Sequence, residues 1–245
     1  RPQVFADVAG QPQVTITLRN ELMAGRIAHA YLFTGSRGTG KTTCAKILAK
    51  ALNCRNPQNG DPCGECEVCR GIDDGSVLDV LEIDAASNNG VDSIRTLREE
   101  AGFTPAAARY RVYIIDEVHM LSTGAFNALL KTLEEPPEYV VFFLLTENAE
   151  ALLPTITSRC VMLKLRNIRN TLIRKYLMEV LEVPDYKADM CTAFAQGNLG
   201  RAIMLANSEH FNEIREEAIQ LLKYIHEMEL SEIVQAVNRI TAYKL

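Results

Sequence analysis

One stretch near the N-terminus has the residue types and spacing of a loop that binds nucleotide phosphates. Residues 35–42 read GSRGTGKT and fit the pattern G-x-x-x-x-G-K-S/T. In such a loop, backbone N–H groups point toward the phosphates and the positive end of the following helix favours the anion. Lys41 would reach the β- and γ-phosphates, and Thr42 would offer its hydroxyl to Mg²⁺. The predicted nucleotide-binding residues are Gly35, Ser36, Arg37, Gly38, Thr39, Gly40, Lys41, Thr42 and Thr43.

A second apolar segment ends in two acids. Residues 111–115 have the pattern of a buried strand, and Asp116 and Glu117 follow it. Asp116 could hold Mg²⁺ through water, and Glu117 could orient or deprotonate an attacking water. A strand ending in acids is common and is weak evidence alone. Together with the phosphate loop upstream, it indicates a nucleotide site.

A third apolar segment, residues 140–145, runs into Thr146. Its hydroxyl could hydrogen-bond the γ-phosphate or the attacking water. A strand that simply leads into a helix cap is an equally good interpretation of the same residues.

Four of the seven cysteines form a cluster. They are Cys54, Cys63, Cys66 and Cys69, separated by eight, two and two residues. Four thiolates can close a tetrahedral shell around Zn²⁺, which is the arrangement of a structural site rather than a catalytic one. Redox thiols, or reduced cysteines without a role, are the alternatives.

These residues need a scaffold, and the hydrophobic pattern supplies one. Strands are expected at 30–34, 80–84, 111–116, 140–146 and 160–165, with helices at 11–26, 43–52, 91–102 and 122–134. Alternating strands and helices predict an α/β fold with a parallel sheet covered on both faces. Beyond about residue 167 only helical periods recur, at 169–182, 187–196, 200–207, 211–226 and 230–242.

The expected domains are a nucleotide-binding domain (1–166) with a zinc module (53–70), a helical lid (167–208) and the start of a helical C-terminal segment (209–245). The chain has 245 residues, 47% apolar and 23% charged, which is typical of a globular protein. A net charge of −5 argues against a chain that is a basic DNA binder throughout. No apolar run is long enough for a membrane span, so the cytosol is the expected compartment. The first residues suggest a start within a longer chain.

Several motifs together resemble one family. They are Arg1-Pro2-x-x-Phe5-x-Asp7-x-x-Gly10-Gln11, HAYLF at 29–33, the phosphate loop, the cysteine cluster, AASNNGVD at 85–92, DEVHM at 116–120, NALLKTLEEPP at 127–137 and SRC at 158–160. This combination is similar to the clamp-loader subunits of bacterial DNA polymerase III. Up to about residue 145 the likeness is to the gamma/tau subunit, and from Ala151 onward it is more to the delta-prime subunit.

The resemblance implies an AAA+ ATPase with a small all-α lid. Members of the family form a five-subunit ring that opens a sliding clamp around primer-template DNA when ATP is bound and releases it on hydrolysis. The family's zinc ligands match the four clustered cysteines, and its metal and hydrolytic acids match Asp116 and Glu117. Arg159 matches an arginine that reaches the ATP of the neighbouring subunit. Without the motif it would be a surface arginine.

Two positions depart from the gamma/tau pattern. Thr146 is followed by Glu147 where gamma/tau usually has a pair of threonines, and the lid arginine, Arg201, lies one residue later. On a helix one residue turns a side chain by about 100°, which moves Arg201 away from the position where it would meet the phosphates.

Three hypotheses follow. The favoured one is an ATP-hydrolysing clamp-loader motor. The second is a non-hydrolysing delta-prime-type scaffold that donates Arg159 to a neighbour. The third, another AAA+ DNA motor such as a branch-migration helicase, shares the loop and the acids but does not predict the cysteine cluster.

Overall fold

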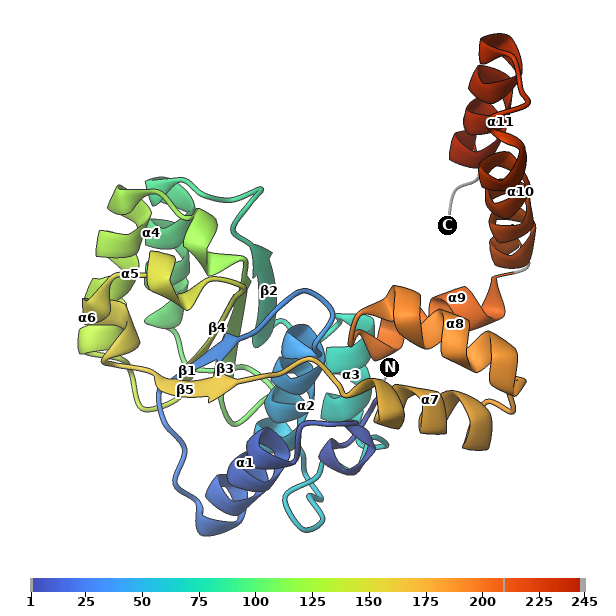
Figure 1. The fold of residues 1–245 in the computed structure, drawn as a ribbon. Coiled ribbons are helices and arrows are strands. Elements are labelled where there is room, and N and C mark those ends of the chain that lie inside the picture. Colours follow the sequence, from blue (N-terminus) through green and yellow to red (C-terminus); the bar gives the residue numbers. More distant parts are fainter. Residues whose placement is uncertain (1, 209, 243–245) are drawn as a thin grey trace. The chain divides into compact units, whose positions relative to one another are not determined.

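The computed structural model describes residues 2–208 and 210–242, and the chain divides into two units, Arg1–Asn167 and Ile168–Leu245 (Figure 1). Arg1 of the N-terminal motif, and positions 209 and 243–245 of the expected C-terminal segment, lie outside the described residues.

The first unit is built on a parallel sheet of five strands, in the order β2-β3-β4-β1-β5. The strands are β1 (Ala30–Thr34), β2 (Val80–Asp84), β3 (Arg111–Asp116), β4 (Val140–Thr146) and β5 (Val161–Lys164). The predicted α/β fold with a parallel sheet is therefore confirmed. Each strand lies where the hydrophobic pattern predicts it, with β5 one residue shorter at each end.

Helices cover both faces of this sheet. Helices α1 (Pro12–Ala24) and α2 (Lys41–Asn53) pack on one face with Tyr31 and Phe143, and α4 (Val91–Ala101) and α5 (Thr123–Glu134) pack on the other with Leu32. Neighbouring residues of a strand point to opposite faces, so a strand buried on both sides is apolar throughout. All residues of β4 are buried accordingly.

Strand register brings the ends of the central strands to one edge. Thr34 at the end of β1 pairs with Thr146 at the end of β4, and Asp84 at the end of β2 pairs with Asp116 at the end of β3. Open parallel sheets bind ligands at the carboxyl ends of their strands. The residues singled out by chemistry therefore lie along the edge where such a site forms.

Some elements were not predicted. They are α3 (Glu67–Asp74), the short α6 (Pro154–Thr157) and the 3-10 helices η1 (Phe5–Asp7), η2 (Val118–Met120) and η3 (Ala149–Ala151). Helix α3 begins inside the cysteine segment, directly after Cys66. Helix α1 is shorter than expected because Pro12 opens it and Gly25, at φ 65°, ends it.

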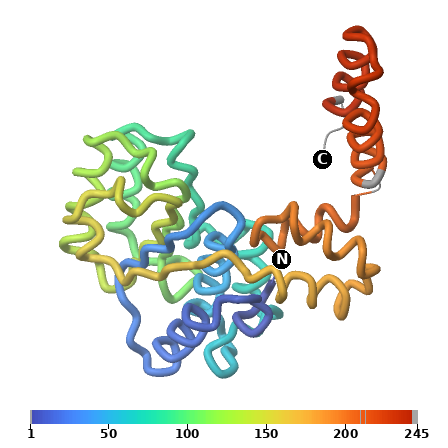
Figure 2. Tube along the Cα trace, in the orientation of Figure 1, coloured from blue at the N-terminus to red at the C-terminus, as the bar shows by residue number. Residues whose placement is uncertain are grey.

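The described residues of the second unit form helices joined by short loops, with no strand among them. It contains α7 (Asn170–Glu179), α8 (Asp185–Ala195), α9 (Leu199–Asn207), α10 (His210–Tyr224) and α11 (Leu230–Ala242). Figure 2 shows α10 and α11 side by side as a hairpin, and the Phe194 ring meets the Phe211 ring edge-on at 5.6 Å. The division of this unit into a lid and a further segment stays a prediction. Among the described residues, no helix is both long and apolar enough to cross a membrane.

Candidate functional site

The loop between β1 and α2 has the shape of a phosphate cradle because glycines permit its turns. Gly35 has φ 151°, and a Cβ added there would lie 2.5 Å from the backbone oxygen of Leu165. Gly40, at φ 100°, turns the chain into α2. The Thr39 hydroxyl donates to the Ser36 carbonyl at 2.8 Å, which braces the loop from within. Its tip, residues 36–38, is exposed.

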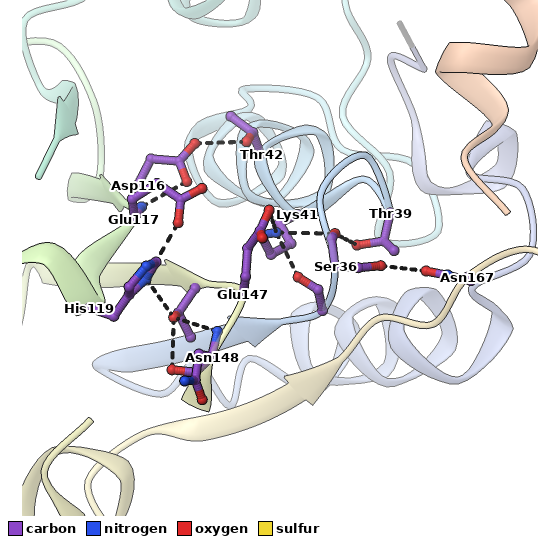
Figure 3. Close-up of polar contacts among 12 residues, drawn as sticks. Ser36, Thr39, Lys41, Thr42, Asp116, Glu117, His119, Glu147, Asn148 and Asn167 are labelled. Atoms are coloured by element: carbon purple, nitrogen blue, oxygen red, sulfur yellow. Dashed lines mark hydrogen bonds and ion pairs between the residues drawn. The ribbon is translucent and has the colours of Figure 1, made fainter. Parts of the chain in front are cut away.

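Lys41 lies inside this loop rather than in solvent. Only 6% of the residue is exposed, and Nζ donates to the carbonyl oxygens of Gly35 at 2.7 Å and Ser36 at 3.2 Å. The Glu147 carboxylate is 3.9 Å away, as Figure 3 shows. Because an ammonium group has three donors, it can exchange these carbonyl partners for phosphate oxygens.

The two acids at the end of β3 have different surroundings. Asp116 accepts hydrogen bonds from the Thr42 hydroxyl at 3.0 Å and from the Glu117 backbone N–H at 2.9 Å. Glu117 has left-handed backbone angles, φ 49° and ψ 42°, which residues other than glycine rarely adopt. Thr42 and Asp116 together offer the oxygen ligands that suit Mg²⁺, so these residues fit the metal that the sequence predicts.

Thr146 is fully buried at the end of β4. Its oxygen accepts from the Asn148 backbone N–H and the hydroxyl donates to the Asn148 carbonyl, each at 3.1 Å, while His119 Nδ1 is 3.0 Å away. The backbone is also engaged, because the Thr146 carbonyl accepts from Gly35 N–H at 3.3 Å. Thr146 therefore touches the phosphate loop, and its role toward a phosphate stays a prediction.

Gln11 is a site residue whose role the sequence did not reveal. Its buried amide donates to the carbonyl oxygens of Thr39 at 3.3 Å and Arg166 at 2.6 Å, and accepts from Arg166 N–H at 3.1 Å. The side chain thus joins the phosphate loop to the segment after β5. The only signal in the sequence is its place at the end of the N-terminal motif.

Arg159 lies on the turn after α6. Its guanidinium donates to Glu134 Oε1 at 2.9 Å and to the Thr155 carbonyl at 2.8 Å, and a third of the side chain is exposed. Within this chain it is therefore paired with α5 and α6 rather than with the phosphate loop. Its predicted role toward a neighbouring subunit is neither met nor contradicted by these contacts.

Arg201 belongs to the second unit. It lies in the first turn of α9, where the Asn198 side chain accepts its backbone N–H at 3.0 Å, and the residue is exposed. Thr43, the other peripheral member of the predicted set, lies half-buried in the first turn of α2.

The cysteine cluster is closed in space. The sulfur atoms of Cys54, Cys63, Cys66 and Cys69 all lie within 4.8 Å of one another. Tetrahedral Zn²⁺ with Zn–S bonds of about 2.3 Å needs sulfurs roughly 3.8 Å apart, so the four residues fit the ion. Helix α3 positions the last two, because Cys66 precedes its first residue and Cys69 lies in its first turn.

Local hydrogen bonds prepare two of these thiols for a metal. The backbone N–H groups of Glu65 and Cys66 lower the pKa of Cys63. Burial opposes the thiolate of Cys66, but backbone and thiol hydrogen bonds, the largest from Arg55 N–H, lower its pKa to about 6. Since the thiolate is the metal ligand, both residues are predisposed to bind Zn²⁺.

The sheet order, the phosphate loop and the acids of β3 define an AAA+ nucleotide-binding fold. RuvB of Thermotoga maritima, a Holliday junction branch migration motor, matches 91% of this chain and 67% of its own with a TM-score of 0.61 and 19% identity. A DNA polymerase III gamma subunit-related protein of Thermotoga maritima matches 92% of this chain and 76% of its own, with a TM-score of 0.54 and 23% identity.

Residues 10–169 match the family described as DNA polymerase III, delta subunit, and the chain belongs to this family. DNA polymerase III subunit tau of Bacillus subtilis is 50% identical over 210 residues, covering 84% of this chain and 37% of the relative. Subunit tau of Escherichia coli is 51% identical over 181 residues, covering 74% and 28%. Subunit gamma of Buchnera aphidicola is 44% identical over 210 residues, covering 84% and 58%.

These relatives confirm the gamma/tau-like character that the motifs predicted. Because the Bacillus subtilis match covers 84% of the chain, the likeness to tau also continues beyond Ala151. The chain spans between 28% and 58% of the length of these relatives.

Proposed function

We propose that this chain is an ATP-hydrolysing subunit of a DNA polymerase III clamp loader, which couples ATP binding and hydrolysis to loading a sliding clamp on primer-template DNA. The observation that carries the proposal is the 3.0 Å hydrogen bond between the Thr42 hydroxyl and Asp116. It joins the phosphate loop to the acidic end of β3, which are the two parts that hold Mg²⁺ in P-loop ATPases.

Each residue at this edge has a role in the proposal. Backbone N–H groups of residues 35–43 and the Lys41 ammonium bind the phosphates, and Thr42 and Asp116 hold Mg²⁺, which neutralises charge on the phosphates when bound. Glu117 orients or deprotonates the attacking water. Thr146 lies near the γ-phosphate, and Arg201 is the lid residue that we assign to nucleotide binding.

The partners are other clamp-loader subunits in a pentameric ring, with Arg159 acting on the ATP of a neighbour. The exposure of Arg159 supports this role, because a surface ion pair such as that with Glu134 contributes only about 0–1 kcal/mol and can be exchanged. The cysteine cluster binds one structural Zn²⁺, and the protein works in the cytoplasm.

The alternative is a non-hydrolysing delta-prime-type scaffold that only donates Arg159. The shifted position of Arg201 favours it. The intact set of Lys41, Thr42 and two acids favours hydrolysis, since a scaffold has no use for them.

Glu117→Gln separates the two. In the complex assembled with partner subunits, this substitution keeps the shape of the side chain but removes the carboxylate, so we expect ATP turnover at this subunit's site to be abolished with nucleotide binding retained. Glu99→Gln, an exposed change on α4, is the matched control. Unchanged turnover in the Glu117→Gln complex would establish the scaffold.

A branch-migration motor is the third candidate because RuvB shares the fold. Metal analysis of the purified chain distinguishes it. One zinc per chain supports a clamp loader, whereas no zinc removes the feature that sets the chain apart from such motors.

A further inference from the structure

His119 lies between two residues of the nucleotide site. Its Nδ1 is 3.0 Å from Thr146 Oγ1 and 3.4 Å from Glu117 Oε2, as Figure 3 shows. About a quarter of the side chain is exposed. The ring therefore links the end of β4 to the acid that follows β3.

The hydrogen bonds around Thr146 determine where the His119 proton lies. The Asn148 carbonyl can only accept, so the Thr146 hydroxyl proton points to it, and the Asn148 N–H can only donate, so it uses one lone pair of Oγ1. One acceptor site then remains on Thr146. We infer that His119 fills it as a donor from Nδ1, because the Glu117 carboxylate 3.4 Å from the same nitrogen can only accept.

The same proton also faces Glu117. A donor on Nδ1 has two acceptors within reach, the Thr146 oxygen and the Glu117 carboxylate. Repulsion between two acceptors is thereby avoided, and Glu117 is attracted to the ring. Thr146 and Glu117 therefore share one imidazole, so a displacement of Thr146 would move the ring that contacts Glu117.

The backbone conformation of residues 117–120 restricts the position of the imidazole. Glu117 adopts left-handed backbone angles, and the next residues form η2, in which Met120 N–H donates to the Glu117 carbonyl at 2.8 Å. Val118 is fully buried and anchors the turn. The strained turn therefore presents Glu117 and His119 together.

We propose that His119 is a positioning residue that aims the Glu117 carboxylate and makes its place depend on Thr146. This inference rests on the proposed function, in which Glu117 acts on the attacking water and Thr146 lies near the γ-phosphate. His119 acts through its contacts with Glu117 and Thr146. The ring couples the position of Thr146 to the position of the Glu117 carboxylate.

Substitutions at His119 test the role in the assembled complex. His119→Asn puts an amide nitrogen near the place of Nδ1, whereas His119→Gln puts one near Nε2, and His119→Ala removes both. We expect His119→Ala and His119→Gln to lower kcat about 10–100-fold, since a displaced catalytic group costs about that much. Nucleotide Kd should stay within twofold, and His119→Asn should recover most of the lost rate.

Two controls separate positioning from folding. The thermal midpoints of the variants should stay close to that of the wild type, and the kcat losses of His119→Ala and Thr146→Val should be non-additive because the two residues act through one contact. Equal rates for all His119 variants, a rate increase in His119→Ala, or Kd losses as large as the kcat losses would overturn the proposal.

A spectroscopic test does not need hydrolysis. Nitrogen NMR of the imidazole in the intact chain without nucleotide should place the proton on Nδ1, and Thr146→Val and Glu117→Gln should each shift this resonance. A proton on Nε2, or a resonance that neither substitution moves, contradicts the inference. If the wild-type complex hydrolyses no ATP, the proposed function fails while this measurement still decides the His119 contact.

Discussion

The Thr42 hydroxyl donates a hydrogen bond of 3.0 Å to Asp116 Oδ2, so the first turn of α2 is joined directly to the end of β3. Seventy-four residues separate the two in the chain. The contact exists because β4 alone lies between β1, which leads into α2, and β3. It places a hydroxyl and a carboxylate where one divalent cation can meet both.

Lys41→Ala should weaken nucleotide binding in the isolated chain. Hydrogen bonds to charged groups contribute about 1.5–3 kcal/mol, so the affinity should fall roughly 10–100-fold. Calorimetry with ATP and Mg²⁺ measures the change. Lys46→Ala is the matched control, because Lys46 lies on the same helix but pairs with Glu82 at 2.6 Å, outside the loop. Equal affinity of the two variants would contradict the assignment of the cradle.

Cys63→Ser should release zinc and destabilise the first unit. A structural zinc site contributes folding free energy, and each 1 kcal/mol lost lowers the midpoint of a domain of this size by about 2–4 °C. Zinc content and thermal unfolding are the measurements. Cys160→Ser, outside the cluster, should retain the metal. If the purified wild-type protein contains no zinc, and a chelator does not change its thermal midpoint, the four cysteines are thiols without a metal.

Arg159→Ala should leave nucleotide binding to its own chain unchanged, because Arg159 contacts Glu134 and Thr155 instead of the phosphate loop. In the assembled complex, however, an arginine supplied to a neighbour's ATP accelerates turnover by about 10³–10⁵-fold. Single-turnover hydrolysis in rings that carry the variant measures this loss. Glu134→Gln is the control, since it removes the ion pair but keeps Arg159. A normal rate with Arg159→Ala would exclude the arginine finger.

Asp79 should make stability depend on pH. Burial opposes its charge, but N–H groups of Ala106, Ala107 and Ala108, together with Arg111, hold the pKa of Asp79 below its usual value. A carboxylate with a lowered pKa stabilises the fold above the unfolded pKa, near 3.9, and this contribution is lost as pH falls further.

Asp79→Asn should therefore cost about 1–3 kcal/mol at pH 7, because buried N–H donors lose their acceptors. The difference from the wild type should begin to shrink below about pH 4, where the carboxyl of the unfolded chain takes up a proton, and should be lost once the pH falls through the lowered pKa of the folded state. Urea unfolding at both pH values is the measurement, with Asp92→Asn, an exposed change on α4, as control. A cost that is constant with pH would show that the charge of Asp79 is irrelevant.

Local patterns in the sequence predicted most of the elements of the fold. Short apolar runs predicted all strands of the sheet, and helical spacing of apolar residues predicted the long helices, because these patterns report burial that each element needs on its own. The short helices were not predicted. Helix α3 spans only eight residues, so although its buried residues Val68, Cys69, Gly71 and Ile72 recur at helical spacing, the segment is too short for that spacing to identify a helix.

What the chain determined alone was therefore the chemical inventory: a glycine loop with Lys41, the two acids after β3 and four clustered cysteines. Tertiary structure decided which of these groups meet. Strand order joined Thr42 to Asp116, Gln11 reached Arg166 across 155 residues, and the left-handed turn at Glu117 brought His119 beside Thr146. Such contacts depend on the packing of segments far apart in the chain, and no pattern within one segment encodes them.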